Sequence, residues 1–188
     1  MKKRKIVLIS GLITAGKTTT SHELAKVLPN WIFIDVWKIK EMFEPLGLKD
    51  RSVMIKISKS SMIHITREVL RKMQRNIILQ EAKPAFVKRH LRNDLKKYNY
   101  EIYSFFLVNN LDDAIRRDKQ REKPTMNIGK RAGSDKEWIE KGRTKPVKGD
   151  VIINTSEHSI KEVRNIILKT IREKPKKHPY ARAIRRSW

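Results

Sequence analysis

The chain has 188 residues, and 44 lysines and arginines against 20 aspartates and glutamates give it a formal net charge of +24. This length suits one domain with a sizeable core, and a hydrophobic content of 39% excludes wholesale disorder. Because the sequence has no cysteine, disulfides, thiolate nucleophiles and cysteine-based metal centres are excluded. No apolar run reaches the roughly 18 residues of a membrane span, and the N-terminal apolar stretch ends at Ser10, too early for a signal peptide. We therefore expect a cytoplasmic protein.

The positive charge is concentrated in a few segments. Residues 6–48 carry no net charge, whereas residues 49–97 carry +10, residues 115–149 carry +7 and residues 172–188 carry +6. Lysine-rich surfaces of heat-adapted proteins usually gain glutamate in step, which this chain does not. The uneven distribution favours an anionic partner, and binding to a polyanion should weaken as salt is added.

Short apolar runs alternate with helical patterns along the chain. The runs predict five strands, over residues 6–9, 32–34, 77–79, 102–108 and 151–153. Helical patterns cover residues 17–28, 62–73 and 85–97, the segment from Asp112 or Asp113 to about Glu122, and the segment after a capping box formed by Ser159 and Glu162. This alternation predicts βαβ units, and hence a three-layer α/β/α fold in which a five-stranded, mainly parallel sheet has helices on both faces.

The organisation of the chain predicts one domain over residues 1–173. Residues 123–148 contain proline, glycine and many charges with little periodicity, so we expect a mobile lid over about residues 114–148. Residues 174–188 form a basic tail beyond the last predicted helix. In parallel sheets, ligands bind at the carboxyl ends of the strands. Polar residues that directly follow predicted strands are therefore expected to lie along one rim.

The segment GLITAGKT, residues 11–18, fits the phosphate-loop pattern G-x-x-x-x-G-K-[ST] and lies between a predicted strand and a predicted helix. Its glycines let backbone N–H groups point at phosphate oxygens, and the helix N-terminus adds partial positive charge. Lys17 is expected to bridge the β- and γ-phosphates, and Thr18 to bind Mg²⁺. The residues expected to hold ATP are Gly11, Leu12, Ile13, Thr14, Ala15, Gly16, Lys17, Thr18 and Thr19.

Glu81 follows residues 77–80, just after the third predicted strand, where an acid commonly assists magnesium binding, so it is a second candidate metal ligand. The phosphate loop leaves three classes open: kinases, GTPase switches and ATP-driven motors. A GTPase would read guanine through N-K-x-D, but the chain has Asn109-Asn110-Leu111-Asp112 and lacks D-x-x-G. A motor generally needs a larger core than this chain can form. The kinase class is favoured.

Four features together resemble the small P-loop kinases that include polynucleotide kinases, chloramphenicol phosphotransferase, adenylylsulfate kinase and zeta-type toxins. After the phosphate loop, Asp35-Val36-Trp37-Lys38 is similar to a D-x-x-R motif, with lysine in place of the arginine. Residues 117–121, Arg-Asp-Lys-Gln-Arg, are similar to the R-N-x-x-R of a lid helix, and the strand and turn that end at Thr155 and Ser156 look like an adenine-side segment. The resemblance implies a P-loop fold and ATP-dependent phosphoryl transfer, with Asp35 as the base and Thr155 beside the nucleotide.

Phosphoryl transfer needs positioning and charge neutralisation more than covalent help. Asp35, at the rim, is expected to accept or orient the proton of the acceptor hydroxyl. It also suits the N-cap of a helix that starts near Trp37, and the two roles are compatible. Arg117 and Arg121 lie about one helical turn apart, so both can stabilise charge on the transferred phosphoryl group.

The surplus charge outside the nucleotide-binding segment suggests a polyanionic acceptor. Lys38, Lys83 and Arg89 are candidate phosphate contacts, and Trp37 is a candidate for stacking on an unpaired base. The leading hypothesis is a polynucleotide kinase that transfers the ATP γ-phosphate to a hydroxyl of RNA or DNA, the 5′ hydroxyl first. The alternatives are a kinase for a small molecule or nucleotide, and a nucleic-acid-stimulated ATPase that phosphorylates no acceptor.

Overall fold

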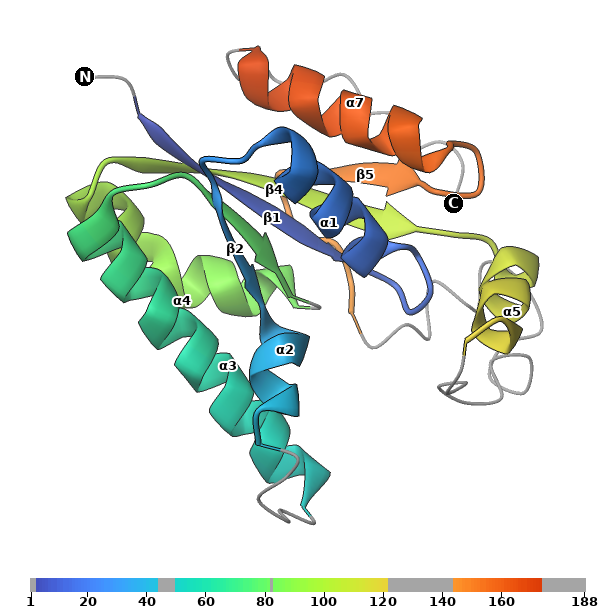
Figure 1. The fold of residues 1–188 in the computed structure, drawn as a ribbon, viewed down its shortest axis with the longest axis horizontal. Helices are drawn as coiled ribbons and strands as arrows, with labels where there is room; N and C mark the ends of the chain where they lie inside the picture. Colours follow the sequence, from blue (N-terminus) through green and yellow to red (C-terminus); the bar gives the residue numbers. More distant parts are fainter. Residues whose placement is uncertain (1–2, 44–49, 82, 122–143, 174–188) are drawn as a thin grey trace.

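The computed structural model describes residues 3–43, 50–81, 83–121 and 144–173 (Figure 1). The strands are β1 (Arg4–Gly11), β2 (Ile32–Asp35), β3 (Ile77–Gln80), β4 (Tyr100–Val108) and β5 (Asp150–Asn154). The helices are α1 (Lys17–Val27), α2 (Val36–Glu41), α3 (Arg51–Glu68), α4 (Pro84–Lys97), α5 (Leu111–Lys119) and α7 (Ile160–Arg172), and a π-helical turn, η2 (Val69–Met73), directly continues α3. Within the described ranges, no helix has the length and apolar character that a membrane span needs.

All five strands run parallel, in the order β2-β3-β1-β4-β5, so the strand that leads into the phosphate loop lies in the middle of the sheet. Helices α1 and α7 cover one face, and α2, α3 and α4 lie on the other (Figure 1). Helix α5 lies beyond the carboxyl end of β4. This is the expected three-layer α/β/α fold, with a sheet that is wholly rather than mainly parallel.

Alternating side chains of β1 supply both halves of the core. Val7 and Ile9 belong to the apolar cluster that includes residues of α1 and α7, whereas Ile6 and Leu8 pack with residues of α2, α3 and α4. All four side chains are completely buried. A strand buried on both faces has a continuous apolar run rather than an alternating one, which is why residues 6–9 predict it so clearly.

Helix α3 is longer than the sequence analysis predicted. It begins at Arg51 rather than near Met62, because the Asp50 side chain caps it by accepting hydrogen bonds from the N–H groups of Ser52 and Val53, at 2.7 Å and 3.4 Å. Its first turns carry serine and lysine between the apolar residues, so periodicity alone did not reveal them.

One of the two N-caps predicted for the last described helices, α5 and α7, is wrong and the other is confirmed. Helix α5 is capped by Asn110, whose side chain accepts the N–H of Asp113 at 2.8 Å, so the predicted cap at Asp112 or Asp113 is wrong. The two aspartates lie in the first turn instead, where their charge suits the helix dipole. The capping box of Ser159 and Glu162 is confirmed for α7.

Part of the predicted lid and all of the basic tail lie outside the described residues. The lid prediction over residues 114–148 begins in α5 and ends in a described stretch that leads into β5, but residues 122–143 are not described. The same holds for residues 174–188. The mobile lid and a role for the tail stay predictions.

Candidate active site

The phosphate loop leaves β1 at Gly11, where only glycine fits. The backbone there has φ of 139°, and a Cβ on Gly11 would lie 2.1 Å from the carbonyl oxygen of Leu107 in β4. The N–H of Leu12 donates to that same oxygen at 2.9 Å. The first glycine of the motif is therefore required by its packing against β4, which fixes the start of the loop.

Thr14 and Gly16 shape the loop, because both have left-handed backbone conformations, with φ of 60° and 80°. This conformation is uncommon for a β-branched residue, and the Thr14 side chain is held in place by its neighbours. Its Oγ1 donates to the carbonyl oxygen of Ile13 at 2.6 Å and accepts from Nδ2 of Asn109 at 3.1 Å. Gly16 faces open space, so its conformation rather than crowding requires glycine.

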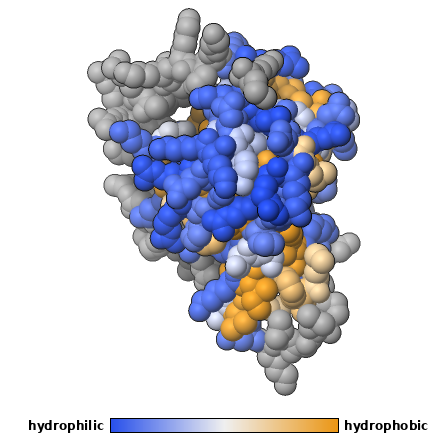
Figure 2. Space-filling view, turned by 90° about the vertical axis from the view of Figure 1, so that its left-hand side faces the viewer, coloured by the Kyte–Doolittle hydropathy of each residue, from blue (hydrophilic) through white to orange (hydrophobic). Residues whose placement is uncertain are grey.

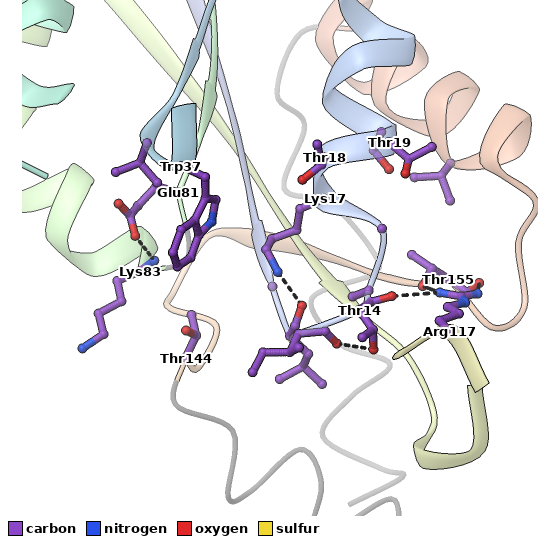
Figure 3. Close-up of a pocket in the computed structure, with 18 of the residues that line it drawn as sticks. Thr14, Lys17, Thr18, Thr19, Trp37, Glu81, Lys83, Arg117, Thr144 and Thr155 are labelled. Atoms are coloured by element: carbon purple, nitrogen blue, oxygen red, sulfur yellow. Dashed lines mark hydrogen bonds between the residues drawn. The ribbon is translucent and has the colours of Figure 1, made fainter. Parts of the chain in front are cut away.

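Helix α1 begins at Lys17 with no side chain capping its first N–H groups, an arrangement that favours an anion at this end. The Lys17 ammonium donates to the carbonyl oxygen of Leu12 at 2.5 Å, so it folds over the loop (Figure 3). Burial and the nearby Arg121 lower the pKa of Lys17 to about 8, against the opposing charges of Glu81 and Asp35. A bound triphosphate would favour the ammonium form.

The end of β3 and the start of α1 form the candidate magnesium site. The Thr18 hydroxyl accepts a hydrogen bond from Nε2 of Gln80 at 3.1 Å. The buried Glu81 carboxylate accepts the N–H of Lys83 at 3.0 Å and lies 3.5 Å from Nζ of Lys59. These oxygens suit magnesium. The described residues contain no group of three or more histidines, aspartates or glutamates that could hold a metal alone, so magnesium would rely on ATP phosphates and water.

A cavity of about 1040 Å³ lies in front of the phosphate loop and is lined by all of residues 11–20. Its volume is at the upper end for ligand pockets, with room for a nucleotide and a second small molecule. Figure 3 shows Arg117 and Thr155 to one side of Lys17, and Trp37 and Glu81 to the other. We name these the Arg117 side and the Trp37 side of the cavity.

On the Arg117 side, one guanidinium joins α5, the phosphate loop and the turn after β5. It donates to Oγ1 of Thr155 at 2.9 Å, to the Thr155 carbonyl oxygen at 2.8 Å and to the carbonyl oxygen of Thr14 at 3.4 Å. The Asp113 carboxylate lies 3.7 Å away. Arg117 thus fixes the wall of the cavity in this structure, and its expected contact with the phosphoryl group stays a prediction.

Arg121 lines the same cavity just beyond the end of α5. Its guanidinium lies 3.8 Å from the Asp118 carboxylate, and the side chain keeps 43% of its surface exposed. It is close enough to lower the pKa of Lys17. A bound triphosphate would stabilise two neighbouring cations of this kind, and the expected contact of Arg121 with phosphate stays a prediction.

The Trp37 side combines an aromatic ring with three lysines. Trp37 and Lys40 come from α2, Lys59 comes from α3, and Lys83 precedes α4. Trp37 keeps 38% of its surface exposed, and Lys59 pairs with the buried Glu81. An aromatic face next to several ammonium groups suits a ligand that has both a planar or apolar part and negative charge.

Asp35 ends β2 and is only 7% exposed. Its carboxylate accepts the N–H of Trp37 at 2.9 Å, which confirms that it caps α2. Burial raises the pKa of Asp35, and the hydrogen bond from Trp37 partly opposes this. Asp35 is not among the residues that line the cavity wall. The predicted role as a base therefore stays a prediction.

The structure does not bring Lys38 or Arg89 to the cavity. Trp37 and Lys40 share the side of α2 that lines the cavity, and Lys38 lies on another side. Lys38 is exposed there and pairs with Glu41 at 2.8 Å. Arg89 is exposed on α4. Neither residue lines the cavity, so their expected contacts with the phosphates of an acceptor stay predictions.

Sequence reasoning missed Gln80, Lys40 and Lys59. Gln80 directly follows the predicted strand over residues 77–79, so its position could have marked it as a candidate, but the neighbouring Glu81 was chosen instead. Lys40 and Lys59 resemble any other surface lysine, and only the packing of α2 against α3 brings both to one wall.

The sheet order, the phosphate loop after the central strand and the cationic cavity in front of it define a P-loop kinase. The model of the Zeta toxin family matches residues 1–173. The chain therefore belongs to the Zeta toxin family and is an ATP-dependent kinase. No match to the chain was found among curated proteins.

Solved structures agree on the fold. The tunicamycin resistance protein of Deinococcus radiodurans has a TM-score of 0.65 at 18% identity, with 90% of this chain and 96% of that chain covered. The APS kinase of Mycobacterium tuberculosis, in complex with AMPPNP and APS, has a TM-score of 0.66 at 16% identity, with 92% and 100% covered. A sugar kinase from Janibacter sp. HTCC2649 has a TM-score of 0.60 at 13% identity, with 91% and 95% covered. At these identities the likeness shows the fold alone.

Proposed function

We propose that this kinase phosphorylates a hydroxyl group of a small, negatively charged molecule. The observation that carries the proposal is the Trp37 side of the cavity, where an indole ring and the lysines Lys40, Lys59 and Lys83 line the same space as the phosphate loop. A nucleotide held by the loop and the Arg117 side leaves this side for the acceptor. The APS kinase whose structure holds AMPPNP and APS together is a precedent for two small ligands in this fold.

In the proposed reaction, the acceptor oxygen forms a bond to the γ-phosphorus while the bond from that phosphorus to the ADP oxygen breaks. Lys17 and Arg121 neutralise charge on the triphosphate. Asp35 is not part of the cavity wall, but its charge acts on Lys17, so it lies near the phosphate loop. In the proposal it receives the hydroxyl proton, and its raised pKa suits a base better than the ordinary value does. Magnesium bound through Thr18 would add positive charge at the phosphates.

A second candidate acceptor is nucleic acid, favoured by the exposed cations of α4. Arg89, Arg92 and Lys96 follow one another at helical spacing. Figure 2 shows a mainly hydrophilic surface over the upper part of this side of the molecule and an apolar patch below it. These side chains lie outside the cavity, so they can hold a polyanion without positioning a hydroxyl. The small acceptor agrees better with the site.

Incubation with γ-labelled ATP and a panel of acceptors tests the proposal. The panel contains phosphorylated and carboxylated small molecules, neutral sugars and a 5′-hydroxyl oligonucleotide. Label is expected on anionic small molecules and not on the oligonucleotide. Label on the oligonucleotide alone would contradict the proposal, and phosphate release stimulated by RNA or DNA without any labelled acceptor would identify an ATPase.

A further inference from the structure

Strand β3 ends in a buried amide that contacts the phosphate loop. Gln80 has no exposed surface and lies level with Ile9 of β1 in the sheet. Its Nε2 donates to Oγ1 of Thr18 at 3.1 Å, the hydroxyl expected to bind magnesium. Glu81, to which the sequence analysis gave this position, instead pairs with Lys59. The side chain that contacts the metal-binding hydroxyl is therefore neutral.

The other polar atom of this amide, Oε1, is buried and has no hydrogen-bond partner among the described residues. Such atoms are rare and call for a reason. Rotation about one side-chain bond exchanges the oxygen and the nitrogen of a glutamine with little change of shape. In the exchanged orientation, Gln80 accepts the Thr18 hydroxyl proton, both lone pairs of Thr18 Oγ1 are available to a metal ion, and the amide nitrogen takes the buried position of Oε1.

We propose that Gln80 is a positioning residue for Thr18 and that it sets the magnesium dependence of ATP binding. A carboxylate in its place would add negative charge beside the metal and would repel a metal-free triphosphate. The neutral amide holds Thr18 without either effect, so the negative ligands of the metal come mainly from the phosphates. The inference rests on the part of the proposed function in which magnesium binds through Thr18, and it is independent of the identity of the acceptor.

Two substitutions separate this role from simple packing. Gln80→Leu removes the hydrogen bond to Thr18 at nearly constant volume, and Gln80→Glu keeps the shape and adds a charge. The same changes at Gln74 are the controls, because this exposed glutamine precedes β3 and lies at the amino end of the strands, opposite to the phosphate loop. Circular dichroism and thermal unfolding establish that each variant is folded.

Titration calorimetry then measures ATP binding with magnesium and with EDTA, in the absence of any acceptor. Gln80→Leu is expected to weaken magnesium–ATP binding about tenfold and to leave metal-free ATP binding unchanged. Gln80→Glu is expected to lower the magnesium concentration for half-maximal ATP binding and to weaken metal-free ATP binding about tenfold. Both Gln74 variants should bind as the unmodified protein does.

Identical magnesium dependence in the unmodified protein and both Gln80 variants would overturn the inference. An equal loss of ATP binding with and without magnesium would also overturn it, because that is the result of a residue that only packs the loop. If Gln80→Leu does not fold, the comparison of Gln80→Glu with Gln74→Glu decides. Because no acceptor is present, a wrong acceptor class leaves these results unaffected.

Discussion

Residues 6–48 and residues 49–97 contribute to one cavity in opposite ways. The first segment has no net charge, yet it contains the loop for the triphosphate, because backbone N–H groups and the start of α1 supply much of the positive potential. The second segment carries +10, but of its described lysines and arginines only Lys59 and Lys83 line the cavity. Net charge along the chain therefore does not locate the phosphate site.

Some of the surplus charge joins structural elements instead. Arg67 of α3 donates to the Asp94 carboxylate at 3.0 Å and to the carbonyl oxygen of His90 at 2.8 Å, which links α3 to α4. Lys88 of α4 pairs at 2.5 Å with Asp150 of β5, whose side chain is completely buried. The prediction of a polyanionic acceptor treated Arg67 and Lys88 as free cations, although both are paired in the structure.

The largest expected effect concerns the neutral segment. Lys17→Ala removes the ammonium that lies over the phosphate loop, so labelled phosphoryl transfer is expected to fall below detection. Lys26→Ala is the control, since Lys26 lies on the same helix, is exposed and pairs with Glu23 at 2.7 Å. Retained transfer in Lys17→Ala would contradict the phosphate-loop assignment.

Asp35→Asn tests whether this carboxylate of the neutral segment takes part in the chemistry. Asparagine still caps a helix, so the free energy of unfolding and ATP binding should change little, while kcat should fall by about 10²–10⁴. Asp50→Asn makes the same change at the N-cap of α3 and should leave kcat unchanged. A normal kcat in Asp35→Asn would show that Asp35 only caps α2.

The neutral segment was also the more predictable one. The strand before Gly11, the helix after Gly16 and the roles of the loop residues follow from local pattern, because each depends on neighbours in the chain. The Trp37 side depends on distant contacts, because Lys59 reaches Glu81 only where α3 packs beside β2 and α4. Such contacts leave no periodic signal in the sequence.

The Arg117 side shows a second limit of sequence reasoning. Arg117 and Arg121 both line the cavity, but Arg121 lies beyond the end of α5 at Lys119, so the two residues do not share a helix face as their spacing predicted. The spacing also does not reveal that Thr155 and the Thr14 carbonyl oxygen engage the Arg117 guanidinium, whereas Arg121 lies near Lys17. Residue spacing gives the face of a helix, but the partners on that face come from other elements.

The lowered pKa of Lys17 predicts a pH dependence of ATP binding. Lys17 is cationic below about pH 8 and neutral above it, and bound phosphates raise its pKa. ATP affinity should therefore be flat below pH 8 and fall by up to about tenfold per pH unit above it. Calorimetry in buffers of different ionisation enthalpy should show proton uptake near pH 8. Lys17→Arg, which stays charged, should abolish that uptake, and a flat profile in the unmodified protein would refute the prediction.

Substitution of Lys59 and Lys83 tests whether residues 49–97 contribute to acceptor binding in the cavity. Lys83→Ala removes an ammonium from the Trp37 side, so KM for an anionic acceptor should rise about tenfold while KM for ATP stays constant. Lys59→Ala should raise it further, since it also leaves the buried Glu81 carboxylate without this partner. Lys56→Ala, on the exposed part of α3, is the control. A rise in KM for ATP alone would place these lysines at the nucleotide.

The smallest effect on catalysis is expected from the exposed cations of α4. Replacement of Arg89, Arg92 and Lys96 by serine should leave kcat and both KM values for a small acceptor unchanged, because none of the three lines the cavity. Retention of the protein on an oligonucleotide column should shift to lower salt, since fewer phosphates are neutralised. The matched control replaces the three exposed cations Lys161, Lys169 and Arg172 of α7. If only the α4 variant loses phosphoryl transfer, α4 is part of the acceptor site and the acceptor is a polyanion that extends beyond the cavity.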